Sequence, residues 1–199
     1  DDRLRYLNSG LSDIKQPSNY WQYGWTGFYG ISGAAQLAGA IGEDDNDDAT
    51  VLYVGAVKSL GGLTMMLLNP LPVLGGLDEL DQLPQETKQQ KLDRLAATER
   101  ILEESARRAD ERYTIKPHLI GLVVNLLGAG AIVAWGDKDD ALASTALGVA
   151  INEAAIWSQP SAAQKYWQSY QRKFNGVGVN SIDWRIVPGI NSVTLQVAF

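Results

Sequence analysis

The side chains with the greatest chemical potential stand inside or at the start of long apolar segments. Glu153 and Lys58 each interrupt such a segment, and His118 stands at the start of another. A charged side chain is costly in a bilayer, so its presence there marks a functional candidate by default. The candidate ligand-binding or buried polar residues are Glu153, Lys58, Asn125, Asn152 and His118.

Glu153 and His118 each have a functional and a structural interpretation. As a functional residue, Glu153 is an acid or base of an active site. As a structural residue, it faces a polar seam and contacts Lys58, Asn125 or another polar group, because an unpaired buried charge is costly. His118 is then a polar residue at the end of an apolar segment, next to Pro117. The sequence favours the structural interpretation for both residues.

Several classes of site lack the residues that they require. The chain has one histidine and no cysteine, which excludes thiolate sites, multi-histidine metal sites and disulfides. It has no phosphate-loop, dinucleotide-binding or zinc-protease motif. The acidic loop at 43–48 lacks the glycine and terminal glutamate of an EF-hand, so a solvated turn is favoured and calcium is the lesser alternative. We therefore predict no catalytic residue, no metal and no cofactor, and we favour a non-enzyme.

Four apolar segments position the candidate residues: 25–42, 51–68, 117–135 and 141–157. The third has no Asp, Glu, Lys or Arg, and as a helix it would be roughly 28 Å long, close to the hydrocarbon thickness of a bilayer. Small residues in these segments allow close helix packing, in a membrane or in a soluble bundle. The sequence predicts a mainly α protein in which the four segments form an antiparallel four-helix bundle.

The polar segments have other patterns. Residues 84–113 combine many charges with a modest apolar stripe, which predicts a long amphipathic helix that faces solvent. Pro17 and Ser18 indicate the start of a helix. The prolines and glycines at 70–76 predict a break, and residues 161–174 predict a short amphipathic helix.

The C-terminal residues change from helical to alternating apolar periodicity. Residues 182–187 and 193–199 predict a β-hairpin around a turn that begins at Pro188. The predicted domains are a helical bundle over 1–174 and this appendage over 175–199. A lone hairpin is marginal in water, so its apolar face needs the helical body or another subunit as cover. The interface candidates are Trp184, Leu195, Val197 and Phe199.

Charge separates the two ends of the apolar segments. The turns at 43–50 and 136–140 hold eight acidic residues and one lysine, whereas the other Lys and Arg residues, Lys58 excepted, lie on the opposite side. If the segments cross a membrane, both termini lie on the Lys- and Arg-rich side, as the positive-inside tendency requires. A soluble four-helix bundle would separate its loops in the same way. The net charge of −6 indicates no nucleic-acid partner.

The last third of the chain resembles an uncharacterised group of bacterial cell-envelope helical proteins. The resemblance lies in AINEAAIWSQP at 150–160, WRIVPG at 184–189 and the final Phe199. It implies an envelope location and no activity. The alternating residues before Phe199 also resemble the closing strand of outer-membrane barrels, but one short hairpin cannot close a barrel. Inner and outer membranes both stay open as locations.

Three functions are consistent with these patterns. The preferred one is a non-enzymatic structural or assembly protein of the bacterial envelope, embedded in or associated with the membrane. Its partners are lipid and either a second copy or another protein, which meets its small-residue faces. The alternative is a soluble helical bundle that binds a lipid or other apolar ligand. The third is an enzyme that uses Glu153 as acid or base.

Overall fold

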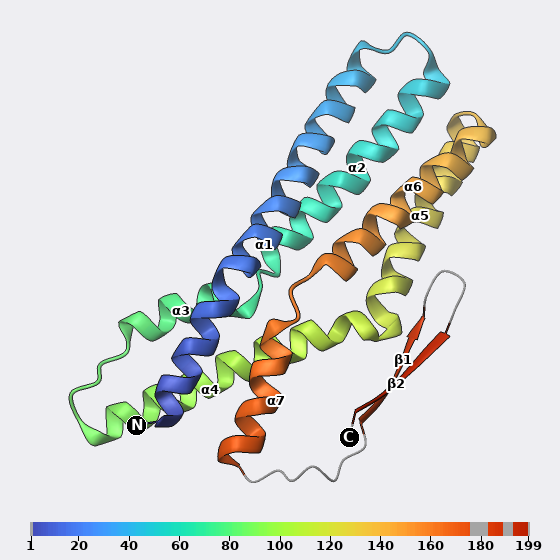
Figure 1. Cartoon of the computed structure of the whole chain (residues 1–199). Helices are drawn as coiled ribbons and strands as arrows, with labels where there is room; N and C mark the ends of the chain where they lie inside the picture. Colours follow the sequence, from blue (N-terminus) through green and yellow to red (C-terminus); the bar gives the residue numbers. More distant parts are fainter. Residues whose placement is uncertain (1, 176–182, 189–192, 199) are drawn as a thin grey trace. The chain divides into compact units, whose positions relative to one another are not determined.

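The chain is mainly α-helical in its computed structural model, which describes residues 2–175, 183–188 and 193–198 (Figure 1). In the two strands only the backbone is described. The elements are α1 (Asp2–Gly42), α2 (Asn46–Leu68), α3 (Pro72–Gln82), α4 (Lys88–Asp110), the short 3-10 helix η1 (Glu111–Tyr113), α5 (Ile115–Trp135), α6 (Lys138–Ser158), α7 (Ala162–Phe174), β1 (Asp183–Pro188) and β2 (Val193–Ala198). All four predicted apolar segments lie in helices.

The chain divides into two compact units. Unit 1 is Asp1–Pro17, Leu71–Ile115 and Pro160–Phe199, and unit 2 is Ser18–Pro70 and Lys116–Gln159. Unit 2 therefore contains the four apolar segments, and unit 1 gathers the polar segments from both ends and the middle of the chain. This division differs from the predicted boundary after residue 174, because segments far apart in sequence pack together.

α1 continues through Pro17, where the sequence predicts a helix start. Leu7, Leu11 and Ile14 are buried at helical spacing before the proline, and Ser18 is buried one turn later. Packing of this stripe on both sides of the proline stabilises the helix where local propensity favours a break. The predicted start at Pro17 is therefore wrong.

α3 forms where the sequence predicts a break. Pro72 lies in its first turn, where a missing N–H group costs little. Gly76 lies against α4, and a Cβ atom at this position would be 2.6 Å from the side chain of Ile101. The glycine is therefore a packing contact between two helices rather than the end of one.

α4 is the predicted amphipathic helix, and it begins later than predicted, at Lys88. The Thr87 hydroxyl accepts from the backbone N–H of Gln90 at 3.2 Å, and the Gln90 side chain accepts from the backbone N–H of Thr87 at 2.9 Å. This reciprocal capping box satisfies N–H groups that a helix start leaves unpaired. The two hydrogen bonds fix the first residue of the helix.

Unit 1 has a core of large apolar side chains. Leu7 and Leu11 of α1, Ile101 and Leu102 of α4, and Tyr170 of α7 are almost completely buried. Burying such side chains is the usual source of stability for a protein in water. Unit 1 therefore has the interior of an ordinary water-soluble domain.

β1 and β2 pair antiparallel, from Asp183 opposite Ala198 to Pro188 opposite Val193. The residues that connect the strands lie outside the described part of the chain, as does Phe199. The side chains of both strands lie outside it as well. The predicted interface role therefore stays a prediction for Trp184, Leu195, Val197 and Phe199.

The helices of unit 2 are joined at one end by two acidic turns, at 43–45 and 136–137. Asp45 accepts from the backbone N–H groups of Asp47 and Asp48, at 2.8 and 3.4 Å, and thereby caps α2. Asp137 accepts from the backbone N–H of Asp139 at 2.8 Å and caps α6. These aspartates start the two helices, because they satisfy N–H groups of the first turn.

Candidate functional site in the apolar helices

Glu153 of α6 faces His118 of α5. The His118 Nδ1 atom lies 2.9 Å from each carboxylate oxygen, and the Trp157 indole N–H donates to Oε2 at 2.9 Å. The His118 side chain is 19% exposed and that of Glu153 is 34% exposed. The carboxylate thus contacts other polar groups, an imidazole and an indole, and neither Lys58 nor Asn125 is among these contacts.

Lys58 of α2 reaches across α5 to α6. Its ammonium donates to the Ser144 hydroxyl at 2.9 Å, to the Ser144 carbonyl at 3.2 Å and to Asn125 Oδ1 at 3.3 Å. Its stem passes Gly128, where a Cβ atom would lie 3.2 Å from Lys58 Cδ. These three oxygen atoms are neutral, so Lys58 connects three helices through hydrogen bonds to uncharged groups.

Asn125 and Asn152 each lie over a glycine of the opposite helix. A Cβ atom at Gly148 would clash with the Asn125 side chain, and one at Gly121 would clash with Asn152. Asn125 is 4% exposed and donates to the Gly121 carbonyl at 2.9 Å. The two contacts are reciprocal, since each helix supplies an asparagine and a glycine four residues apart. The glycines therefore let α5 and α6 approach closely with polar amides between them.

α1 and α2 pack in a similar way. A Cβ atom at Gly55 would clash with the Gln36 side chain, and one at Gly62 would lie 2.7 Å from the Tyr29 ring. Gln36 Nε2 donates to the Ser59 hydroxyl at 3.0 Å. Glycine contacts and side-chain hydrogen bonds thus connect this helix pair too.

The outer surface of unit 2 is rich in large apolar side chains, whereas its interior holds small and polar ones. Ile31, Leu127 and Leu142 are 74%, 70% and 77% exposed. Among the described residues, unit 1 exposes only Leu92 and Ile115 of this kind. Unit 2 exposes Tyr20, Tyr23, Phe28, Ile31, Leu37, Ile41, Tyr53, Val57, Leu60, Met65, Leu67, Leu68, Leu119, Ile120, Leu122, Val123, Val124, Leu126, Leu127, Val133, Trp135, Leu142 and Leu147.

Unit 2 has fewer buried apolar residues than unit 1, and most of them are small. They are Trp21, Ala40, Ala56, Ile132, Ala141 and Ala155. A water-soluble protein rarely exposes a large continuous apolar surface while it buries alanines and amides. Unit 2 thus has the reverse of the side-chain distribution found in unit 1.

Two stretches of the described chain are long and apolar enough to cross a membrane, Asn46–Gln82 and Ile115–Trp135. The core helix of a soluble protein passes the same test of length and composition, but it is mostly buried. Here only 6% and 17% of the residues in the most apolar windows are buried. Low burial distinguishes both stretches from a soluble core helix.

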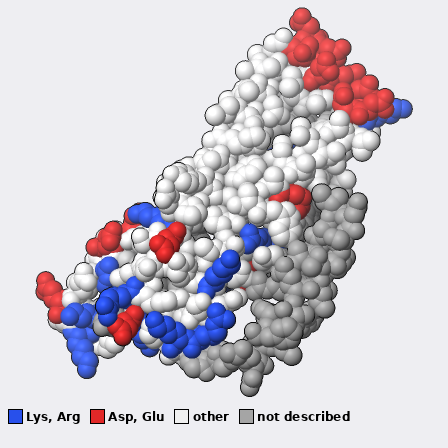
Figure 2. Space-filling view, in the orientation of Figure 1, with Lys and Arg blue, Asp and Glu red and all other residues white. Residues whose placement is uncertain are grey.

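The two acidic turns lie side by side at one end of unit 2. The Thr50 hydroxyl next to the first turn donates to the Trp135 carbonyl next to the second, at 3.0 Å. Repulsion from Asp45 is the main cause that raises the pKa of Asp48, and Asp140 from the other turn adds to it. In Figure 2 the acidic side chains gather at this end, and the adjoining surface of the helices carries almost no charge.

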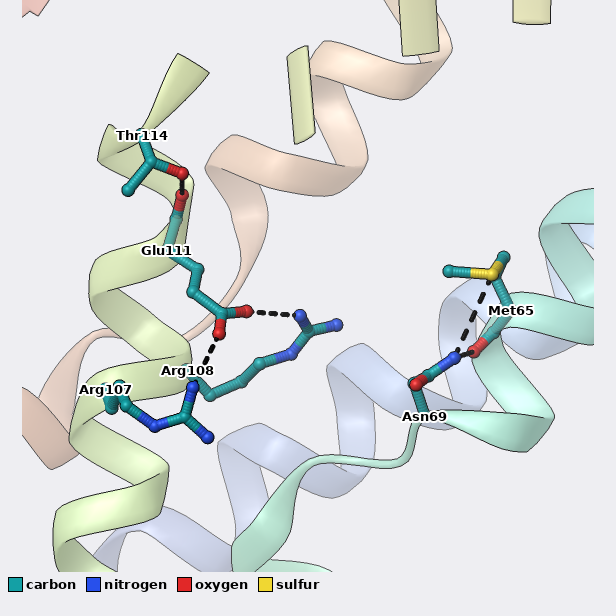
Figure 3. A network of polar contacts seen from close by, with 6 residues as sticks. All are labelled: Met65, Asn69, Arg107, Arg108, Glu111 and Thr114. Carbon is teal, nitrogen blue, oxygen red and sulfur yellow. Dashed lines mark hydrogen bonds and ion pairs between the residues drawn. The ribbon is translucent and has the colours of Figure 1, made fainter. Parts of the chain in front are cut away.

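Polar contacts are found where α2 ends and just before α5 begins (Figure 3). Arg107 and Arg108 donate to the two carboxylate oxygens of Glu111, at 2.9 and 2.6 Å, and the Thr114 hydroxyl donates to the Glu111 carbonyl at 2.7 Å. At the end of α2, the Asn69 side chain donates at 3.3 Å to the carbonyl four residues earlier. Side chains of the chain itself thus satisfy the polar groups at these helix ends.

The sequence argument missed Trp157, Ser144 and the packing glycines as partners of the candidate residues. Trp157 stands four residues after Glu153, so helical spacing alone placed both on one face. Ser144 and Gly148 carry no comparable signal, because their role depends on which helices face each other.

The chemistry that this arrangement supports is proton exchange between a carboxylate and an imidazole, at Glu153 and His118. In the part of the chain that the structure describes, no group of three or more His, Cys, Asp or Glu residues is placed to hold a metal ion. Both Glu153 oxygens already have partners within the protein. Its acid–base role therefore stays a prediction.

Comparisons with known proteins found no matching family model, no matching curated protein and no matching solved structure. The resemblance of residues 150–160 and 184–189 to bacterial envelope proteins therefore stays an expectation. The geometry of unit 2 is the main guide to function.

Proposed function

We propose that the protein is a non-enzymatic structural protein of a bacterial envelope membrane. In this proposal the helices of unit 2 form an antiparallel four-helix bundle that crosses the bilayer. The supporting observation is the reversed side-chain distribution, with Leu127 and Leu142 outside and Asn125 inside. Exposed apolar surface costs about 25 cal/mol per Å² in water, and lipid removes that cost.

The polar contacts inside unit 2 agree with a membrane environment. A bilayer core offers no water to unpaired polar groups, so these groups need partners within the protein. The Lys58 ammonium has three oxygen acceptors, and the Glu153 carboxylate has ring nitrogens of His118 and Trp157 beside it. The envelope assignment rests on the sequence resemblance of the last third of the chain.

The proposed role is assembly with a second copy or with another membrane protein. Gly24 and Gly27 of α1 have no neighbouring atom within 4 Å of a Cβ position. Ala146, Ala150 and Ala154 are exposed at four-residue spacing on α6. Small outward residues allow a further helix to approach closely, which is the common packing device of membrane helices.

The paired strands are proposed as the predicted hairpin appendage. Trp184 and Leu195 would belong to an apolar face that meets the helical body or another subunit. An edge that adds a strand from a neighbour is a common mode of protein association. We prefer the neighbouring subunit, since a hairpin has two edges.

The soluble alternative, a bundle that binds a lipid or other apolar ligand, needs an apolar interior between the helices. The inward residues of unit 2 are mostly glycine, alanine and amides, with Lys58 and Glu153 among them. This interior offers an apolar ligand few contacts. The membrane function is therefore preferred, both over this alternative and over an enzyme that uses Glu153.

Membrane flotation tests the proposal. We expect the full chain to float with membranes after washes with high salt and urea, and to need detergent for extraction. A monodisperse protein in the detergent-free soluble fraction would contradict it. A lipid that copurifies with such soluble protein would support the ligand-binding alternative.

A matched pair of variants sharpens this test. Val123→Asp with Leu127→Asp places two carboxylates on the outer face in the middle of α5, where the side chains are 46% and 70% exposed. A soluble protein tolerates such changes, whereas a membrane span loses insertion at roughly 3 kcal/mol per charge. Leu92→Asp in unit 1, at a site 50% exposed, is the control that keeps flotation.

A further inference from the structure

We propose that unit 1 lies on the cytoplasmic side of the membrane and that the two acidic turns of unit 2 face the opposite side. This assignment rests on the membrane-spanning function proposed for unit 2. It assigns each surface of the protein to one compartment. Partners of that surface must therefore be found in the same compartment.

The acidic turns belong to one surface. The Thr50 hydroxyl binds the Trp135 carbonyl at 3.0 Å, and a Cβ atom at Gly136 would lie 3.2 Å from the Asp47 carbonyl. Both helical hairpins, α1–α2 and α5–α6, therefore place their turns on the same side. Unit 2 therefore crosses the membrane an even number of times, and residues 18 and 159 at its two ends lie on the same side of the membrane.

The segments that carry most Lys and Arg form one body. Arg3 from the N-terminal part of α1 donates to the Tyr170 hydroxyl of α7 at 2.8 Å and pairs with Glu99 of α4 at 2.8 Å. Residues before, between and after the apolar helices are joined in this way. Unit 1 therefore cannot be divided between two sides of a membrane.

The distribution of Lys and Arg then determines the orientation of the protein in the membrane. The acidic turns hold Lys138 as their single cation, whereas unit 1 and Lys116 hold every other Lys and Arg except Lys58. The segments that carry these cations are short enough for the positive-inside tendency, which counts Lys and Arg and largely ignores Asp and Glu. The acidic residues of unit 1 therefore do not weaken the assignment.

The negative charge of the acidic turns also agrees with a position on the side of the membrane opposite the cytoplasm. Asp45 and Asp137 cap α2 and α6, so their charge also stabilises the positive ends of two helix dipoles. Anionic lipids of the cytoplasmic leaflet attract cations and repel such a cluster of carboxylates. The caps explain why aspartates stand at these turns, and the leaflet charge favours the same orientation as the distribution of Lys and Arg.

The absence of native cysteine makes a labelling experiment direct. Three single-cysteine variants of the full chain are treated in cells with a membrane-impermeant maleimide, before and after permeabilisation. Asp44→Cys probes the acidic turns, Gln85→Cys probes unit 1, and Leu127→Cys probes the middle of α5. All three positions are exposed on the protein.

We expect Asp44→Cys to react in intact cells, Gln85→Cys to react only after permeabilisation, and Leu127→Cys to react only after denaturation in detergent. Reaction of Gln85→Cys in intact cells with protection of Asp44→Cys would overturn the orientation and leave the membrane function standing. Equal reaction of Asp44→Cys and Gln85→Cys in intact cells would contradict the claim that the protein has one orientation in the membrane. Reaction of Leu127→Cys in native permeabilised cells would overturn the membrane function itself.

Discussion

At the scale of single residues, a charge inside the apolar helices lies where a neighbouring helix supplies polar partners. Lys58 and Glu153 are visible in the sequence, because a charge within an apolar run is out of place by type alone. Ser144 and His118 could not be predicted as partners, because they meet Lys58 and Glu153 only once α2, α5 and α6 are packed. Trp157 lies four residues after Glu153 on the same helix, so its contact was open to prediction. The sequence therefore identified the candidates and their need for polar partners, but it did not name His118 and Trp157 as the partners of Glu153.

Glu153→Leu tests whether this carboxylate stabilises unit 2. We expect a loss of roughly 1–3 kcal/mol in unfolding free energy, because the imidazole and the indole of Trp157 lose their shared partner. Thermal unfolding in detergent measures the change. Glu86→Leu, an exposed site in unit 1, is the control with little effect. Equal stability of the two variants would contradict the contact as described.

Lys58→Glu should be more damaging than Glu153→Leu. The new carboxylate would face the Ser144 carbonyl and the Asn125 amide oxygen, which repel it, and only the Ser144 hydroxyl could donate to it. A loss of about 3–5 kcal/mol is typical when a buried charge loses its partners. Lys138→Glu makes the same charge change in an exposed turn and should cost far less. The reverse order in chemical denaturation would refute the role of Lys58.

Tyr170 gives unit 1 a dependence on alkaline pH. Burial, with the hydrogen bond to Glu99 as a lesser cause, raises its pKa from 10.0 to about 12. The folded state thus favours the neutral phenol, so this stabilisation is complete below about pH 10 and is lost as pH rises through about 12. Tyr170→Phe should flatten the fall in stability across that range. Tyr20→Phe, at a site 70% exposed, should behave as wild type, and an unchanged fall in Tyr170→Phe would count against burial as the cause.

At the scale of helices, glycines set how closely neighbours approach. Gly121→Leu should destabilise unit 2 by roughly 1–3 kcal/mol or more, because the new side chain occupies the space of Asn152. Gly130→Leu in the same helix has no atom within 4 Å of its Cβ position and is the matched control. Circular dichroism during thermal unfolding would compare them. A smaller loss for Gly121→Leu than for Gly130→Leu would show that the close α5–α6 contact is wrong.

Helices could be predicted from the sequence where apolar runs are long. The prediction failed where a proline or glycine stands at a packed position. Three of the four apolar segments appear as helices close to their predicted bounds, in α2, α5 and α6, whereas the first is the last part of α1, which begins at Asp2. The sequence predicted a helix start at Pro17 and a break at Gly76, since local propensity penalises both residues inside a helix. Tertiary packing overrides that penalty at Ser18 and at Ile101.

At the scale of the molecule, the two units differ in which side chains they bury. Unit 1 buries residues such as Leu102 and Tyr170, and unit 2 exposes residues such as Leu127. Composition revealed that the helices are apolar, but it could not reveal which way they face. The near absence of an amphipathic pattern in 117–135 left lipid, ligand and protein as possible surroundings. In the structure the other helices cover little of α5, which supports the proposal that lipid surrounds it.

The central claim is that the outer face of α5 contacts lipid. Spin labels on single cysteines at positions 127, 132 and 85 measure it, through collisions with oxygen, which concentrates in lipid, and with a nickel chelate, which stays in water. Leu127 is 70% exposed, Ile132 is fully buried and Gln85 is exposed in unit 1. We predict high oxygen and low nickel collision at 127, low values of both at 132, and high nickel collision at 85. Nickel collision at 127 as high as at 85 would contradict the account.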